Sequence, residues 1–317
     1  MVNPVVAVLP ALVRPLLEPH LPDWIDARWF SSKQEAMALA PLAEIGWFDM
    51  YDKADMAAAI RSAGRMRWLN SIFAGVDAMP LAELQQRHIH LTNGAGINAI
   101  TIAEYVLMGM LTIAKGYREV VRAQERREWL KDSPGKVELY GSRALVLGHG
   151  AIGRLVQERL QVFAVDVTVV RRTPDAGGKT LAPTEWRARL AEFDWIILAV
   201  PATAETVRMI GAAELAAMKP SAVLVNVARG TVVDQAALVD ALRERRLGAA
   251  LLDVTDPEPL PPDHPLWSLD NAHITMHLSG RAQSLMFKRS AQRFLDNLQR
   301  YRRGEALQHQ VNLALGY

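Results

Sequence analysis

The sequence predicts an α/β protein built from two domains, each with a doubly wound parallel sheet. Short apolar runs alternate with longer helical patterns through most of the chain. These runs are apolar almost throughout, as expected for strands that helices cover on both faces. A length of 317 residues suits two domains of ordinary size.

The first α/β unit is expected from Val5 to about residue 98. We predict strands near 5–9, 25–30, 43–48, 66–70 and 88–92, with helices between them. The pattern changes near Gly94-Ala95-Gly96. A single long helix is then expected over about 99–127, apolar at first and basic later.

A connector rich in turn residues, 131–135, leads into a second α/β unit. Its strands are expected at 143–147, 166–170, 195–200, 222–227, 248–253 and 272–275. The chain is helical again over about 281–303, and we expect this tail to return to the first domain. The predicted division is therefore 1–98 plus 284–317 for one domain and 99–283 for the other.

The composition is that of a globular protein, with 50% hydrophobic and 22% charged residues. A net charge of +2 gives no reason to expect nucleic acid or a membrane surface as a partner. No apolar run reaches the roughly 20 residues of a membrane span, and the N-terminus lacks the pattern of a secretory signal. The chain has no cysteine, which excludes disulfides and thiolate metal sites. We expect a cytoplasmic protein without a metal site.

The sequence Gly-His-Gly-Ala-Ile-Gly at 148–153 follows an apolar strand and opens a helical pattern. In such a turn the first glycine allows a tight bend, the second lets the backbone approach a pyrophosphate, and the third lets helix pack on strand. The helix N-terminus adds amide donors for the phosphates. Residues 99–283 are therefore predicted to form a Rossmann-type dinucleotide-binding domain. The turn residues assigned to the cofactor are Gly148, His149, Gly150, Ala151, Ile152 and Gly153, with the His149 side chain expected to be solvent-exposed and non-catalytic.

The next strand ends in Arg171-Arg172-Thr173. Enzymes that prefer NAD usually place an acid here to accept from the ribose 2′-hydroxyl. Two guanidiniums and a hydroxyl suit a 2′-phosphate instead. We therefore expect NADP(H) to be preferred, with NAD(H) as the alternative cofactor; the competing interpretation is a solvated strand end.

Three polar residues, Arg229, Glu258 and His277, follow three predicted strands of the second unit. Ligands of open α/β sheets bind at the carboxyl ends of the strands. A cation, a carboxylate and an imidazole can together hold a 2-oxo acid, polarise its carbonyl and deliver a proton. Behind a dinucleotide turn, this trio indicates hydride transfer involving a small 2-oxo or 2-hydroxy acid. A Glu258 carboxylate would orient the imidazole and favour its charged form, so reduction is expected to weaken as pH rises and oxidation as pH falls.

Taken together, these motifs resemble the D-isomer-specific 2-hydroxyacid dehydrogenase family over nearly the whole chain. The resemblance also rests on Val200-Pro201-Ala202-Thr203 with Thr206, on Met218-Lys219-Pro220, on residues 225–234 and 248–254, on Glu258-Pro259-Leu260, on 264–267 and on 277–280. It implies that Arg229 binds substrate, that His277 is the acid/base and that Glu258 is its partner. It further implies that Asp253 lies near the nicotinamide carboxamide, and that Val200, Pro201, Thr206 and Ala228 belong to the cofactor site.

In the first domain, residues 73–77 resemble the family's substrate loop, in which backbone amides hold the carboxylate; the residues here are Ala74, Gly75 and Val76. The resemblance makes 1–98 plus 284–317 the substrate domain. It also implies a cleft that closes on substrate, and a homodimer built through the cofactor domains. Weaker candidates for the substrate side are Trp47 and Phe73 as an apolar wall and Arg281 as a second cation, with core packing of Trp47 and a surface position of Arg281 as the alternatives.

One departure from the family pattern is Met276, which stands where the family often has proline, so we expect a looser turn with the same chemistry. Among the family's branches the chain most resembles NADPH-using glyoxylate/hydroxypyruvate reductases. A dehydrogenase for another D-2-hydroxy acid or an oxyanion substrate is one alternative. A dinucleotide-sensing protein like the family's corepressors is another, against which the intact trio argues.

Overall fold

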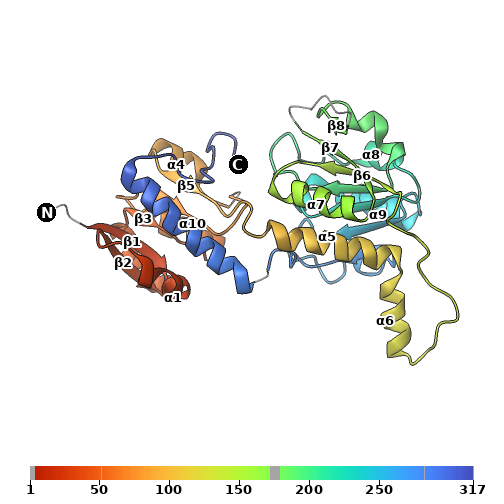
Figure 1. Ribbon diagram of the computed structural model, residues 1–317, viewed down its shortest axis with the longest axis horizontal. Helices are drawn as coiled ribbons and strands as arrows, with labels where there is room; N and C mark the ends of the chain where they lie inside the picture. The colour runs from red at the N-terminus through yellow and green to blue at the C-terminus, as the bar shows by residue number, and fades with distance from the viewer. Residues whose placement is uncertain (1–3, 51, 77, 172–178, 282, 317) are drawn as a thin grey trace. The chain divides into compact units, whose positions relative to one another are not determined.

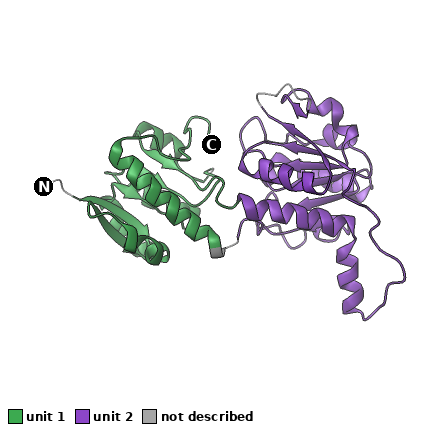
Figure 2. Ribbon diagram, in the orientation of Figure 1, with its two compact units in different colours: residues 1–98, 282–317 green, residues 99–281 purple. Residues whose placement is uncertain are grey.

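The computed structural model of the chain describes residues 4–50, 52–76, 78–171, 179–281 and 283–316. The chain forms two compact units, residues 1–98 with 282–317 and residues 99–281 (Figure 2). Each unit contains one sheet in which every named pairing is parallel. The predicted class, α/β with two parallel-sheet domains, is confirmed.

The first unit has a five-stranded sheet in the order β2-β1-β3-β4-β5, which is the flavodoxin-like order (Figure 1). Its strands are β1 (Val5–Pro10), β2 (Ile25–Phe30), β3 (Ile45–Gly46), β4 (Trp68–Asn70) and β5 (His90–Thr92). Its helices are α1 (Arg14–Leu17), α2 (Lys33–Leu39), α3 (Lys53–Ser62), α4 (Leu81–Gln86) and α10 (Gln283–Arg303), with the 3-10 turns η1 (Ala11–Val13), η2 (Glu18–His20) and η3 (Ala40–Leu42).

The core of this unit lies on both faces of the sheet, because alternate residues of β1 enter different apolar clusters. On one face, the C-terminal helix α10 places Phe294 against Trp47 and Trp68, with ring centroids 5.4 and 5.1 Å apart. Two helices of this unit, α2 and α3, begin at a side chain that caps them. The Asp52 carboxylate accepts from the Asp55 amide (3.0 Å) at the start of α3.

The second unit has a seven-stranded sheet in the order β12-β11-β10-β9-β6-β7-β8. Counted within the unit, this is the dinucleotide-binding order with one strand added, and its order reverses between β6 and β9. The strands are β6 (Arg143–Leu147), β7 (Asp166–Val170), β8 (Thr180–Leu181), β9 (Trp195–Leu198), β10 (Val223–Asn226), β11 (Ala249–Leu252) and β12 (Ala272–Ile274). The helices are α5 (Ala99–Ala114), α6 (Tyr117–Glu125), α7 (Ala151–Val162), α8 (Ala212–Ala217) and α9 (Gln235–Arg243), with η4 (Trp186–Glu192), η5 (Gly230–Val232) and η6 (Pro265–Trp267).

The predicted strands are present, although several are shorter than expected, and the short strand β8 was missed. The single long helix predicted over 99–127 is wrong. It is broken into α5 and α6, which meet at an angle of 70°. Gly116, between them, has a left-handed backbone with φ +60°. No single described helix has the length and apolar character to cross a membrane; only the bent pair of α5 and α6 satisfies both together.

The break is stabilised by close contact with the connector. A Cβ added to Gly116 would lie 2.8 Å from the Gly135 amide nitrogen, and one added to Gly135 would lie 2.1 Å from the Lys115 carbonyl carbon. Both positions therefore require glycine, and the pair fixes the direction in which α6 leaves the unit.

We predict that Gly116→Ala lowers the stability of the chain more than Gly141→Ala does. Both glycines have positive φ, so each substitution costs about 1–2 kcal/mol of backbone strain. Only Gly116 also meets neighbouring backbone, since nothing lies within 4 Å of a Cβ built on Gly141. Denaturant unfolding of the two variants measures the difference. Equal losses of stability would contradict the packing role given to Gly116.

Candidate active site

The glycine turn lies at the point where the strand order of the second unit reverses. Gly148 has φ +101°, and a Cβ there would lie 2.5 Å from the carbonyl oxygen of Ala199. A Cβ on Gly153 would lie 2.0 Å from the Gly148 oxygen, so helix and turn are in close contact. Nothing lies within 4 Å of a Cβ built on Gly150. The middle glycine thus leaves open space at the N-terminus of α7.

The residues around this turn differ in how far they are exposed to solvent. His149 is half-buried rather than solvent-exposed, because its Nε2 is 2.8 Å from the Gln157 amide oxygen. Thr206 donates its hydroxyl to the Pro201 carbonyl (2.7 Å) and accepts from the Thr203 amide (2.8 Å), which fixes the turn after β9. In the same region Val200 is half-buried, Pro201 is exposed and Ala228 is buried.

Arg171 comes directly after β7, whose last carbonyl, that of Val170, accepts from the Gly148 amide (3.4 Å). The end of β7 is thus tied to the glycine turn. Arg172 and Thr173, the other predicted contacts of a 2′-phosphate, lie outside the described residues.

Arg229 is positioned by the turn that ends β10. The side chain of buried Asn226 accepts from the Ala228 amide (3.0 Å) and donates to the Arg229 carbonyl (2.9 Å). A Cβ on Gly230 would lie 2.0 Å from the Thr255 oxygen, so this turn packs directly against the segment after β11. That contact requires glycine and brings Arg229 into the neighbourhood of Glu258.

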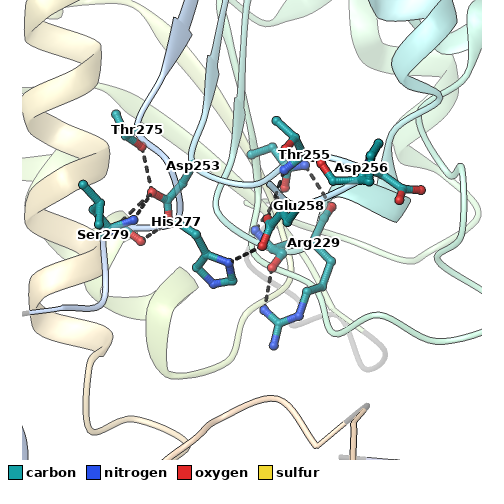
Figure 3. Close-up of polar contacts among 12 residues, drawn as sticks. Arg229, Asp253, Thr255, Asp256, Glu258, Thr275, His277 and Ser279 are labelled. Atoms are coloured by element: carbon teal, nitrogen blue, oxygen red, sulfur yellow. Dashed lines mark hydrogen bonds and ion pairs between the residues drawn. The ribbon is translucent and has the colours of Figure 1, made fainter. Parts of the chain in front are cut away.

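Glu258 and His277 form a direct pair, with Nδ1 of the imidazole 2.8 Å from Oε2 of the carboxylate (Figure 3). The other carboxylate oxygen accepts from the Thr255 amide (3.1 Å). Burial raises the pKa of Glu258, but the His277 hydrogen bond and charge, the Thr255 amide and the Arg229 charge outweigh it and lower the pKa overall. Glu258 is therefore ionised at neutral pH, and a carboxylate can only accept, so the Nδ1–H of His277 donates to it.

The backbone that carries His277 is held by Asp253, the buried residue that follows β11 (Figure 3). One carboxylate oxygen accepts from the Thr275 hydroxyl (2.7 Å) and from the amides of Leu278 (3.1 Å) and Ser279 (3.2 Å). The other accepts from the Ser279 hydroxyl. The Asp253 carbonyl in turn accepts from the His277 amide (2.5 Å). These contacts hold the turn from 275 to 279 from both sides of His277.

Two successive residues of this turn are left-handed, Met276 with φ +52° and His277 with φ +55°. Each costs about 1–2 kcal/mol for a residue other than glycine. Proline, whose ring holds φ near −65°, could not occupy position 276 in this conformation. The looser turn expected from the absence of proline is not what the structure shows, because Asp253 fixes the backbone on both sides.

In the first unit, the predicted substrate loop follows β4. The Asn93 side chain donates to the Ala74 carbonyl (2.7 Å), and the Gly94 amide donates to the Phe73 carbonyl (2.8 Å). Among the described residues, no acceptor bonds the amides of Ala74, Gly75 or Val76.

The weaker substrate-side candidates differ in their exposure. Trp47 is 1% exposed and lies in the core against Phe294, so it does not form an accessible wall. Phe73 is 42% exposed, and Arg281 is exposed just before α10. No group of three or more potential metal ligands occurs within the described ranges.

Sequence reasoning missed the supporting residues of the site. Asn226, Thr275 and Ser279 carry no reaction chemistry of their own, but their side chains fix the turns of Arg229 and His277. The sequence does contain a signal for them, because short polar side chains at strand ends commonly form hydrogen bonds with nearby backbone.

Comparisons with known proteins find a matching family and several similar relatives. Residues 107–279 match the family described as D-isomer specific 2-hydroxyacid dehydrogenase, NAD binding domain. Glyoxylate reductase of Pyrococcus furiosus is 34% identical over 254 residues, which cover 77% of this chain and 75% of that protein. The chain spans only about half (49%) of the D-3-phosphoglycerate dehydrogenase of Archaeoglobus fulgidus, to which it is 32% identical over 80% of its own length.

Solved structures are similar over nearly the full chain. A D-isomer specific 2-hydroxyacid dehydrogenase family protein from Aeromonas salmonicida has a TM-score of 0.87 at 29% identity, covering 98% of this chain and 99% of the other. A D-isomer specific 2-hydroxyacid dehydrogenase from Xanthobacter autotrophicus, in complex with NADPH and MES, has a TM-score of 0.79 at 26% identity, covering 99% and 100%. The fold and site define a nicotinamide-dependent oxidoreductase, and the chain belongs to the D-isomer-specific 2-hydroxyacid dehydrogenase family.

We predict that Asp253→Asn loosens the turn that carries His277. An amide offers one acceptor oxygen where the carboxylate offers two, and its NH2 group would face hydroxyl or amide donors. The free energy of unfolding should fall by about 1–3 kcal/mol. Hydrogen exchange of the Leu278 and Ser279 amides should become faster.

The matched control is Asp240→Asn, the same change at an exposed position of α9. If the Leu278 and Ser279 amides exchange equally slowly in both variants, Asp253 does not hold this turn.

Proposed function

We propose that this protein reduces small 2-oxo acids, glyoxylate and hydroxypyruvate first among them, to 2-hydroxy acids with NADPH. The observation that carries the proposal is the 2.8 Å Glu258–His277 pair next to Arg229, at the strand ends of a dinucleotide-binding sheet. The reductase names of relatives such as the Pyrococcus furiosus protein support the choice of substrates.

The cofactor assignment rests on how the turn fits a dinucleotide. The open space at Gly150, beside the uncapped N-terminus of α7, suits a pyrophosphate held by backbone amides. When bound, the reduced nicotinamide supplies the hydride. Val200, Pro201, Thr206, Ala228 and Asp253 are assigned to the same site.

Preference for NADPH rests on the end of β7. Arg171 follows the strand whose final carbonyl is bonded to the glycine turn, and Arg172 and Thr173 follow it in sequence. Guanidinium groups pair with a dianionic 2′-phosphate by charge-assisted hydrogen bonds. The NADPH complex of the Xanthobacter relative is consistent with this choice.

The proton comes from His277. Because Nδ1 is engaged by Glu258, Nε2 is the ring nitrogen that can donate to the developing alkoxide. Arg229 supplies the cation that holds the substrate carboxylate and polarises the carbonyl. In the first unit, the amides of Ala74, Gly75 and Val76 are assigned to the substrate carboxylate. For oxidation, the neutral imidazole takes the proton back at the same atom.

Assembly as a homodimer through the second unit is part of the proposal. The connector after α6 exposes two large aromatic side chains, Trp129 at 94% and Tyr140 at 75%. Exposed apolar surface of this kind often marks a protein–protein interface. Sedimentation velocity tests this; a monomer at micromolar concentration would contradict it. The cysteine-free sequence supports a cytoplasmic location.

The function is tested by initial rates with glyoxylate and with hydroxypyruvate, each with NADPH and with NADH. We expect kcat/KM to be higher with NADPH than with NADH. Arg171→Ala should lower kcat/KM for NADPH and leave kcat/KM for NADH unchanged. Arg243→Ala, on the exposed face of α9, is the control. Equal or better use of NADH would overturn the cofactor assignment. Turnover of a different acid only would overturn the substrate, and no turnover across a panel of 2-oxo acids would overturn the activity.

We also predict that His277→Asn lowers kcat for reduction by about 10²–10⁴-fold, the usual contribution of a general acid. His20→Asn, at an exposed position of the first unit, should be neutral. A His277→Asn variant that retains the kcat of the unmodified enzyme would exclude His277 as the proton donor.

A further inference from the structure

A carboxylate in the first unit lies directly behind the substrate loop and has no part in the chemistry described so far. Asp49 follows β3 and accepts three hydrogen bonds. One oxygen accepts from the Trp47 indole (2.7 Å) and the Ile72 amide (2.5 Å), and the other from the Ser71 hydroxyl (2.6 Å).

Ser71 extends this network along the loop. Its hydroxyl proton is used on Asp49, so the hydroxyl oxygen is free to accept from the Phe73 amide (3.0 Å). The amides of Ile72 and Phe73 are therefore both engaged toward Asp49 and Ser71. The next three amides, those of Ala74 to Val76, bond no acceptor among the described residues.

The rear of the loop is closed on its other side by the segment after β5. A Cβ on Gly94 would lie 1.8 Å from the Ile72 oxygen, so the two backbones are in direct contact there. Asn93 holds the Ala74 carbonyl, as described above. The segment after β5 therefore contacts the carbonyls of Ile72 and Ala74, while Asp49 and Ser71 accept from the amides of Ile72 and Phe73.

We propose that Asp49 is a positioning residue for substrate: through Ser71 and the amides of Ile72 and Phe73, it orients the amides of Ala74, Gly75 and Val76 toward the substrate carboxylate. This inference rests on the proposed function. Burial raises the pKa of Asp49 to about 6, although the hydrogen bonds from Ile72, Ser71 and Trp47 lower it. At pH 7.5 the Asp49 carboxyl group is therefore ionised, and its two oxygens can accept all three hydrogen bonds.

Successive backbone amides that are not used inside the protein can bind an anion when their N–H groups point to one place. Such an arrangement depends on the peptide orientation more than on side chains. Asp49 fixes the peptides of Ile72 and Phe73, which precede these amides. It can therefore control the affinity for a carboxylate that it does not touch.

The test is Asp49→Asn, assayed at pH 7.5 with glyoxylate and NADPH, and titrated with oxamate in the presence of NADPH by tryptophan fluorescence. Asparagine keeps the shape but offers one acceptor oxygen to three donors. KM for glyoxylate and Kd for oxamate should rise by about tenfold or more, while kcat and KM for NADPH change less than about threefold. Asp52→Asn, three residues away, is the matched control, since asparagine also caps α3.

A lower melting temperature with unchanged KM and Kd would overturn the proposal, because it would make Asp49 structural only. If Asp49→Asn does not fold, Ser71→Ala removes the acceptor of the Phe73 amide and leaves Asp49 in place. It should raise KM and Kd, and unchanged values would overturn the proposal.

The oxamate titration separates this inference from the proposed function. An unmodified protein that reduces no 2-oxo acid but binds oxamate, with binding weakened by Asp49→Asn, would support the loop and contradict the activity. An unmodified protein that neither reduces a 2-oxo acid nor binds oxamate would overturn both.

Discussion

The hydrogen bonds from Asp253 to the turn at 275–279 are the constraint on which the candidate active site depends. They hold two successive left-handed residues, Met276 and His277, whose strain would otherwise release the turn. In this conformation the imidazole meets Glu258 at 2.8 Å. The end of β11, the Asp253 carboxylate and the turn at 275–279 together fix the position of the His277 side chain.

The same physical solution occurs in the first unit. Asp49 accepts from a backbone amide, a serine hydroxyl and an indole, and the loop behind which it lies is predicted to bind substrate. In both units a carboxylate fixes the peptides of a short loop after a strand. A charged acceptor is suited to this task because its hydrogen bonds are stronger than those between neutral groups, and because two oxygens serve several donors at once.

Much of the fold was predictable because its signals are local. Apolar runs located the strands, and the strand–glycine–helix pattern located the turn at Gly148. Arg229, Glu258 and His277 could be proposed from sequence because strand ends of a parallel sheet lie at one edge. The structure places Glu258 and His277 in contact, with the charge of Arg229 acting on Glu258.

The remainder depends on contacts between distant residues. The helix break at Gly116 needs Gly135, and the left-handed conformation at Met276 needs Asp253. Asp49 was overlooked because its partners Ser71 and Ile72 are 22 and 23 residues away. Trp47 was considered as a pocket wall, whereas its ring is in the core and its indole nitrogen serves Asp49.

The account rests on His277 moving a proton under the control of Glu258, and one measurement tests that directly. Rates of 2-oxo acid reduction and of 2-hydroxy acid oxidation are recorded against pH for the unmodified enzyme and for Glu258→Gln. Reduction should decline as pH rises, and oxidation should decline as pH falls, because one direction needs the imidazolium and the other the neutral ring. Glu258→Gln should lower the rate in both directions, because the imidazole loses the carboxylate that orients it. The same limb in both directions, or rates that Glu258→Gln leaves unchanged, would contradict the central claim.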